Sequence, residues 1–122
     1  MNAGKQSPKL TPEEAAIVEA ARERMIARHK LIEGMIRNNE LQLKNESARG
    51  GAQLEFECAK RDANAPGAGP DAQAAVETAS RRFKVLEEDH RKLVAEREFL
   101  NTSLLEFESG SSDQEHKRSG HS

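Results

Sequence analysis

The sequence contains no tryptophan and no tyrosine, and its only aromatic residues are four phenylalanines. A globular core of ordinary size is usually filled with bulkier side chains, so this composition argues against one. The single cysteine, Cys58, excludes an intramolecular disulfide. The chain has no run of about 18 apolar residues, and residues 1–9 lack the apolar segment of a signal peptide. We therefore expect an intracellular, cytoplasmic protein that does not insert into membranes.

Charge of either sign is not in excess. The 19 lysines and arginines nearly balance the 21 aspartates and glutamates, which leaves a net charge of −2. This balance disfavours nucleic acid as a partner. The sequence also lacks phosphate-binding loops, nucleophile elbows and histidine or cysteine clusters at metal-ligand spacing. We therefore expect no enzyme, no cofactor, no metal site and no small-molecule substrate.

A helix start signal stands at Thr11-Pro12-Glu13-Glu14. Thr11 suits the N-cap, proline suits the first helical position, and Glu14 completes a capping box. The pattern predicts a disordered N-terminus over 1–10 and a helix over 11–63.

Two segments rich in glycine interrupt the helical pattern. Gly50 and Gly51 cost about 2 kcal/mol relative to two alanines. Apolar residues return in phase at Leu54, which favours a continuous or kinked helix over a break. Residues 64–70 contain two prolines and two glycines, so they are predicted to form a loop.

The second half of the chain has a heptad repeat over about five heptads. The repeat predicts a second helix over 71–108, within a hairpin spanning 11–109, and a disordered polar tail over 110–122. Its two interleaved series are Ala72, Ala79, Leu86, Leu93, Leu100 and Phe107, and Val76, Phe83, His90, Arg97 and Leu104.

The first helix has an apolar stripe when its residues are placed 100° apart around the axis. The stripe is predicted to be buried partly against the second helix and partly against a partner helix, and it consists of Ile17, Val18, Ala21, Met25, Ile32, Met35, Ile36, Leu43 and Leu54.

A short loop between two long helices makes them antiparallel neighbours. The fold class is therefore all-α, a long antiparallel helical hairpin or coiled coil that is able to dimerise into a four-helix bundle. Folding about Gly67 places Phe83 opposite Gly50 and Gly51, which explains why glycines are tolerated there. The same register leaves residues 12–26 overhanging, without cover from the second helix.

A two-helix hairpin without tryptophan or tyrosine is marginally stable alone, so we expect a protein partner, either a second copy or another helical protein. Asn39, His90 and Arg97 interrupt the apolar seams and are candidates for setting register or partner choice; polar residues at the margin of a shallow interface are the alternative. The predicted interface residues are Val18, Met25, Ile32, Met35, Ile36, Leu43, Leu54, Val76, Phe83, Leu86, Leu93, Leu100, Leu104 and Phe107.

Two segments look somewhat like known helical families. Residues 30–34 and 79–86 resemble the two helices of Rho-effector homology-region repeats, which are antiparallel hairpins that bind small GTPases. The hairpin is also broadly similar to tubulin-binding cofactor A. The gap between the segments is longer than in the first family, and the chain has a polar tail where the second has a third helix. The chain is therefore assigned to neither.

These observations predict a non-catalytic interaction or assembly subunit that acts through heptad-patterned helical surfaces. The alternative is a small helical chaperone or regulator that binds a folded client, such as a small GTPase or a cytoskeletal subunit. An assembly subunit is expected to dimerise or to fold poorly alone, whereas a regulator is expected to be a stable monomer.

Overall fold

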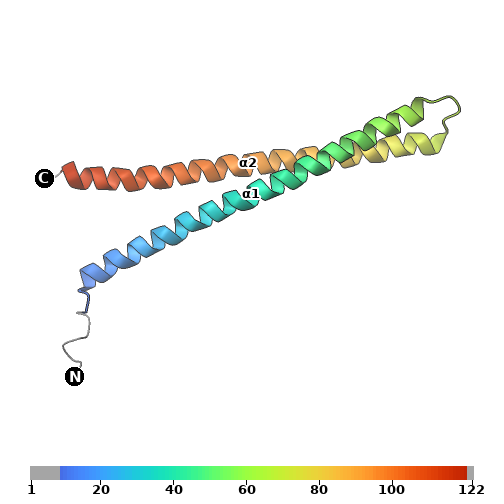
Figure 1. The fold of residues 1–122 in the computed structure, drawn as a ribbon. Coiled ribbons are helices and arrows are strands. Elements are labelled where there is room, and N and C mark those ends of the chain that lie inside the picture. Colours follow the sequence, from blue (N-terminus) through green and yellow to red (C-terminus); the bar gives the residue numbers. More distant parts are fainter. Residues whose placement is uncertain (1–8, 121–122) are drawn as a thin grey trace, which may run out of the picture.

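The computed structural model describes residues 9–120, with side chains through residue 110, and it consists of two long helices. Helix α1 spans Pro12–Asn64 and helix α2 spans Pro70–Gly120. The two run antiparallel and pack against each other as a hairpin (Figure 1). The described residues contain no strand, which confirms the predicted all-α helical hairpin.

Helix α1 begins with the capping box that the sequence predicts. The Thr11 hydroxyl accepts the Glu14 N–H at 3.1 Å, and Glu14 Oε1 accepts the Thr11 N–H at 2.9 Å. The Thr11 backbone N–H, followed by the Thr11 side chain, favours the charged carboxylate and therefore lowers the pKa of Glu14. Two otherwise unpaired donors of the first turn are satisfied in this way, which fixes where the helix starts.

Helix α1 passes through Gly50 and Gly51 without interruption and is about 80 Å long. The predicted packing of Phe83 over these glycines is wrong, since a Cβ atom built on either glycine meets nothing within 4 Å. Phe83 instead stacks on Phe56, with ring centroids 6.5 Å apart. The physical reason is rotational, because the two glycines lie about 120° or more around the helix from Asn38, which faces α2.

The connection between the helices is confined to residues 65–69, one residue shorter at each end than the predicted loop. Gly67 has a φ of +82°, a left-handed backbone conformation that residues other than glycine rarely adopt. Pro70 is the first residue of α2, where its missing N–H has no helical partner to lose.

Helix α2 continues to Gly120 rather than ending at 108, so the prediction of a disordered tail from residue 110 is corrected over 110–120. No proline follows Pro70, and one glycine at Gly110 costs only about 1 kcal/mol relative to alanine. The remaining predicted tail residues, 121–122, and the N-terminal residues 1–8 lie outside the described part of the chain.

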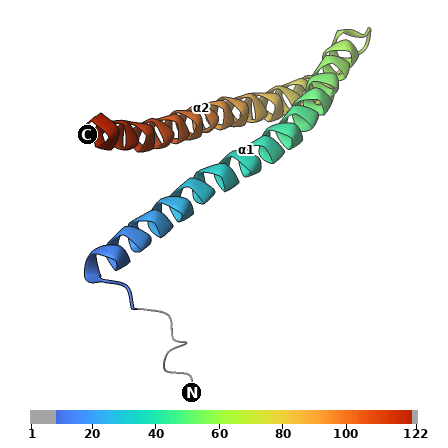
Figure 2. The same cartoon turned by 60° about the vertical axis from the view of Figure 1, so that its left-hand side comes forward.

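The helices lie side by side near the connection and diverge toward their free ends (Figures 1 and 2). Ile17, Val18, Met25 and Ile26 near the free end of α1 are 49–72% exposed. The sequence analysis predicts that these residues have no contact with α2, on the ground that α2 is too short to reach them. In the structure the two helices are of similar length. These residues are exposed because the helices diverge, and because Val18 and Met25 lie on a face of α1 that is turned away from α2.

Two glycine substitutions test this description of the backbone. We expect Gly51→Ala to raise the free energy of unfolding by about 1 kcal/mol, because the new methyl group meets open space and alanine favours the helix. Gly67→Ala should lower it by about 1–2 kcal/mol, because the left-handed φ is strained for alanine. Urea denaturation followed by circular dichroism measures both. If Gly51→Ala lowered the free energy of unfolding instead, that result would support the prediction that Phe83 packs over this glycine.

Candidate functional site

Helix α2 turns its heptad-spaced residues toward α1. Ala79 is buried, and the remaining members of the two series are half-buried. The structure places all the predicted α2 interface residues on this face, together with the specificity candidates His90 and Arg97. These half-buried residues are Val76, Phe83, Leu86, His90, Leu93, Arg97, Leu100, Leu104 and Phe107.

Helix α1 meets α2 with a face that is polar at its centre. Its buried residues are Asn38, Asn45 and Ala52, each seven positions from the next. Gln42 and Arg49, the half-buried residues between them, also follow a seven-residue spacing. We call Asn38, Gln42, Asn45 and Arg49 the polar seam. Sequence reasoning missed this seam because it searched for apolar residues.

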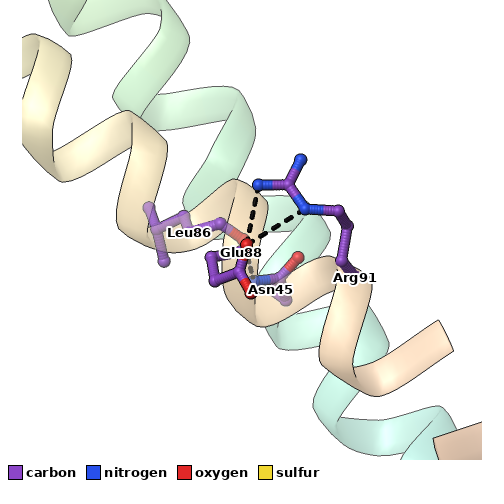
Figure 3. A network of polar contacts seen from close by, with 4 residues as sticks. All are labelled: Asn45, Leu86, Glu88 and Arg91. Carbon is purple, nitrogen blue, oxygen red and sulfur yellow. Dashed lines mark hydrogen bonds and ion pairs between the residues drawn. The ribbon is translucent and has the colours of Figure 1, made fainter. Parts of the chain in front are cut away.

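The two asparagines of the polar seam bond the backbone of α2 directly. Asn45 Nδ2 donates to the Leu86 carbonyl at 3.0 Å, and Arg49 Nε donates to Asn45 Oδ1 at 2.7 Å (Figure 3 shows Asn45 beside Leu86). The Asn45 side-chain amide therefore has a partner for both its nitrogen and its oxygen.

Beside this contact, Arg91 bonds Glu88 at 2.8 Å and lowers the pKa of the Glu88 carboxyl by hydrogen bonding and by its charge.

The arrangement around Asn45 recurs one heptad earlier. Asn38 Nδ2 donates to the Leu93 carbonyl at 2.9 Å and to Glu96 Oε1 at 2.8 Å, while Gln42 Nε2 donates to Asn38 Oδ1 at 2.7 Å. Asn38 is fully buried, at 0% exposure. Because an unpaired buried amide costs about 1–3 kcal/mol, sliding one helix along the other is penalised. The polar seam therefore fixes the register of the hairpin.

The three predicted specificity candidates lie beside the polar seam rather than within it. Asn39 is exposed and accepts a hydrogen bond from Arg97. His90 is half-buried, and its Nδ1 atom is buried without a hydrogen-bond partner. A shallow groove at the edge of the helix pair is lined by all three, together with Glu46 and Arg49.

The predicted apolar face of α1 is on the surface. Ile32 and Met35 are half-buried, but five other predicted interface residues are exposed: Val18 by 54%, Met25 by 72%, Ile36 by 54%, Leu43 by 67% and Leu54 by 65%. The prediction that Ile36, Leu43 and Leu54 pack against α2 is therefore wrong, whereas Val18 and Met25 lie in the segment that was expected to lack cover from α2. From here on, the name apolar stripe is kept for the row Val18, Met25, Ile32, Ile36, Leu43 and Leu54, which is exposed except at the half-buried Ile32.

The reason lies in the angle between the two faces of α1. With 100° per residue, the apolar stripe is centred about 140° around the helix from Asn38. One neighbouring helix cannot cover both faces. Asn38 and Asn45 are directed at α2, so the apolar stripe must be directed away from it.

Ion pairs join the helices on either side of their contact. Arg28 pairs with Glu108 at 2.9 Å, and Arg82 pairs with Glu55. These side chains are about half exposed, and such pairs contribute about 0–1 kcal/mol each. The ion pairs therefore help to orient the two helices and contribute little to the stability of the hairpin.

No group of three or more histidine, cysteine, aspartate or glutamate residues in the described part of the chain is arranged to hold a metal ion. Cys58 is exposed, and its thiol is free. Neither helix, over its described residues, is long and apolar enough to cross a membrane. The distinctive feature of the surface is therefore the apolar stripe.

In comparisons with known proteins, no family model matches the chain, and no curated protein and no solved structure matches it either.

Two asparagine substitutions compare the contribution to stability of a buried residue of the polar seam with that of an exposed residue beside it. We expect Asn45→Ala to lower the free energy of unfolding by about 1–2 kcal/mol, because Arg49 loses its acceptor and the buried site loses its donor. Asn39→Ala, the matched control at an exposed site, should change it by less than about 0.5 kcal/mol. Thermal and urea unfolding measure both variants. Equal effects would show that burial of the asparagine does not matter.

Proposed function

We propose that this protein is a non-catalytic interaction or assembly subunit of the cytoplasm, and that the apolar stripe of α1 is its binding surface for a helical protein. The observation that supports this proposal is the exposure of Met25, Leu43 and Leu54, each at least 65% exposed on one face of a long helix. Large apolar side chains gathered on one exposed face are a common mark of protein–protein interaction sites.

The shape of the stripe indicates the kind of partner. Val18, Ile36 and Leu54 are 18 residues apart, which is five turns of an α-helix, so they lie in one straight line along α1. A straight apolar row flanked by charged residues suits a second amphipathic helix, which buries its own apolar row against it. The polar seam holds α2 on another face, so α1 is able to bind a partner without opening the hairpin.

The only cysteine supports the cytoplasmic part of the proposal, because an unpaired and exposed thiol is usual in reducing compartments.

Charged substitutions in the stripe test the proposal. In the double variant Ile36→Lys/Leu43→Lys, we expect helix content to be retained and association to be lost, because two charges then face any apolar partner. Val85→Lys is the matched control, since Val85 is 60% exposed on α2, away from the stripe. Sedimentation velocity across a dilution series measures self-association. A photoreactive amino acid at position 43 or at position 85, in cells that make the protein, tests for a different partner.

Association or cross-linking that depends on the stripe and not on position 85 supports the assembly role. A helical monomer at every concentration, with no cross-link specific to position 43, contradicts it.

A further inference from the structure

The charged residues beside the apolar stripe differ along the length of α1. On one side of the stripe, Arg22 comes first and Glu33 and Glu40 follow. On the other side, Arg28, which pairs with Glu108 in the single hairpin, comes first and Glu46 follows. All five are exposed. Both sides of the stripe are therefore basic toward the N-terminal end of α1 and acidic toward its middle.

Symmetry decides which of these charges meet when two copies of the stripe pair. In an antiparallel pair, the two-fold axis brings each side of the stripe against the same side of the other copy, running the opposite way. With the axis near residue 31, Arg22 lies opposite Glu40 of the other copy. Opposite charges at such flanking positions favour the pairing and fix its orientation.

A parallel pair brings like charges together instead. Each side of the stripe then meets the other side at the same height, so Glu46 faces Glu40 of the second copy, while Arg28 lies about as near to Arg22 as to Glu33. Like charges at these positions disfavour the parallel orientation.

The antiparallel alignment that pairs the charges also pairs the apolar residues. Val18 lies opposite Leu43 of the other copy, and Met25 lies opposite Ile36. All four side chains are at least half exposed in the single hairpin, so each one has apolar surface left to bury. Charge and apolar pattern thus agree on one arrangement.

We propose that the partner of the apolar stripe is a second copy of this chain, bound antiparallel, with the two α1 helices in the middle and each α2 on the outside. This inference rests on the proposed function and names the partner of that same surface. It follows from the stripe and the polar seam lying about 140° apart around α1, which leaves α2 clear of the second copy.

Disulfide capture between two single-cysteine proteins tests the orientation. Both full-length chains carry Cys58→Ser; one also carries Met25→Cys and the other Ile36→Cys, and different tags distinguish their sizes. An antiparallel pair predicts that mild oxidation of the mixture yields mainly the mixed disulfide. Val85→Cys replaces Ile36→Cys in the matched control, which should yield no mixed product.

The outcomes separate this inference from the proposed function. Disulfides mainly within each species, Met25→Cys to Met25→Cys, mean a parallel pair and overturn the antiparallel one, while assembly through the stripe stands. A helical monomer that forms no disulfide overturns self-pairing. The photoreactive residue at position 43 then decides whether the stripe binds another protein or the assembly role itself fails.

Charge reversal provides an independent readout. Arg22→Glu alone and Glu40→Arg alone should each weaken dimerisation by about three- to tenfold, because each places like charges together at two symmetric sites. The double variant should recover the affinity of the unmodified protein. Circular dichroism confirms that each variant is folded. Failure of the double variant to recover would contradict the proposed pairing of charges.

Discussion

The hydrogen bonds from Asn38 and Asn45 to the carbonyls of Leu93 and Leu86 are the constraint on which the rest of the structure depends. They satisfy two buried amides, and a shift of less than one heptad would separate both amides from these carbonyls. A purely apolar contact between two helices tolerates sliding, whereas buried polar groups with specific partners penalise it. By fixing which face of α1 meets α2, these two residues also determine which face stays on the surface.

The apolar stripe is thus a consequence of the polar seam. The long apolar side chains of α1 that a two-helix contact would ordinarily bury, such as Leu43 and Leu54, are directed outward, while Ala52 and the asparagines occupy the contact. The contact between the two helices therefore buries little apolar side-chain area of α1, and the apolar stripe remains exposed. This division of faces is the basis of the proposal that the protein acts by association through the apolar stripe.

The fold was largely predictable, and the reasons are local. Thr11 and Glu14 form the expected capping box, residues 65–69 make the turn between the helices, and the heptads of α2 face α1 as expected. Each of these depends on residues close together in the sequence. The sequence predicts too early an end for α2, because polar composition alone does not end a helix when no proline follows Pro70.

The face of α1 was not predicted, because its strongest apolar signal points away from α2. The apolar stripe repeats every 3.6 residues and dominates any search for hydrophobic periodicity. A weaker signal was present in Leu31, Asn38, Asn45, Ala52 and Ala59, which recur every seven residues as the heptads of α2 do. Recognising it requires treating asparagine as a contact residue, which only its hydrogen bonds to α2 justify.

The central claim, that α1 contacts α2 through the polar seam and leaves its apolar stripe on the surface, is tested most directly by thiol reactivity at two neighbouring positions. Ala52→Cys and Leu54→Cys, each with Cys58→Ser, share nearly the same local charge but differ in exposure, at 4% and 65% for the native residues. The structure predicts that a thiol reagent modifies the cysteine at position 54 much faster than the one at position 52. Faster modification at position 52 would contradict the account.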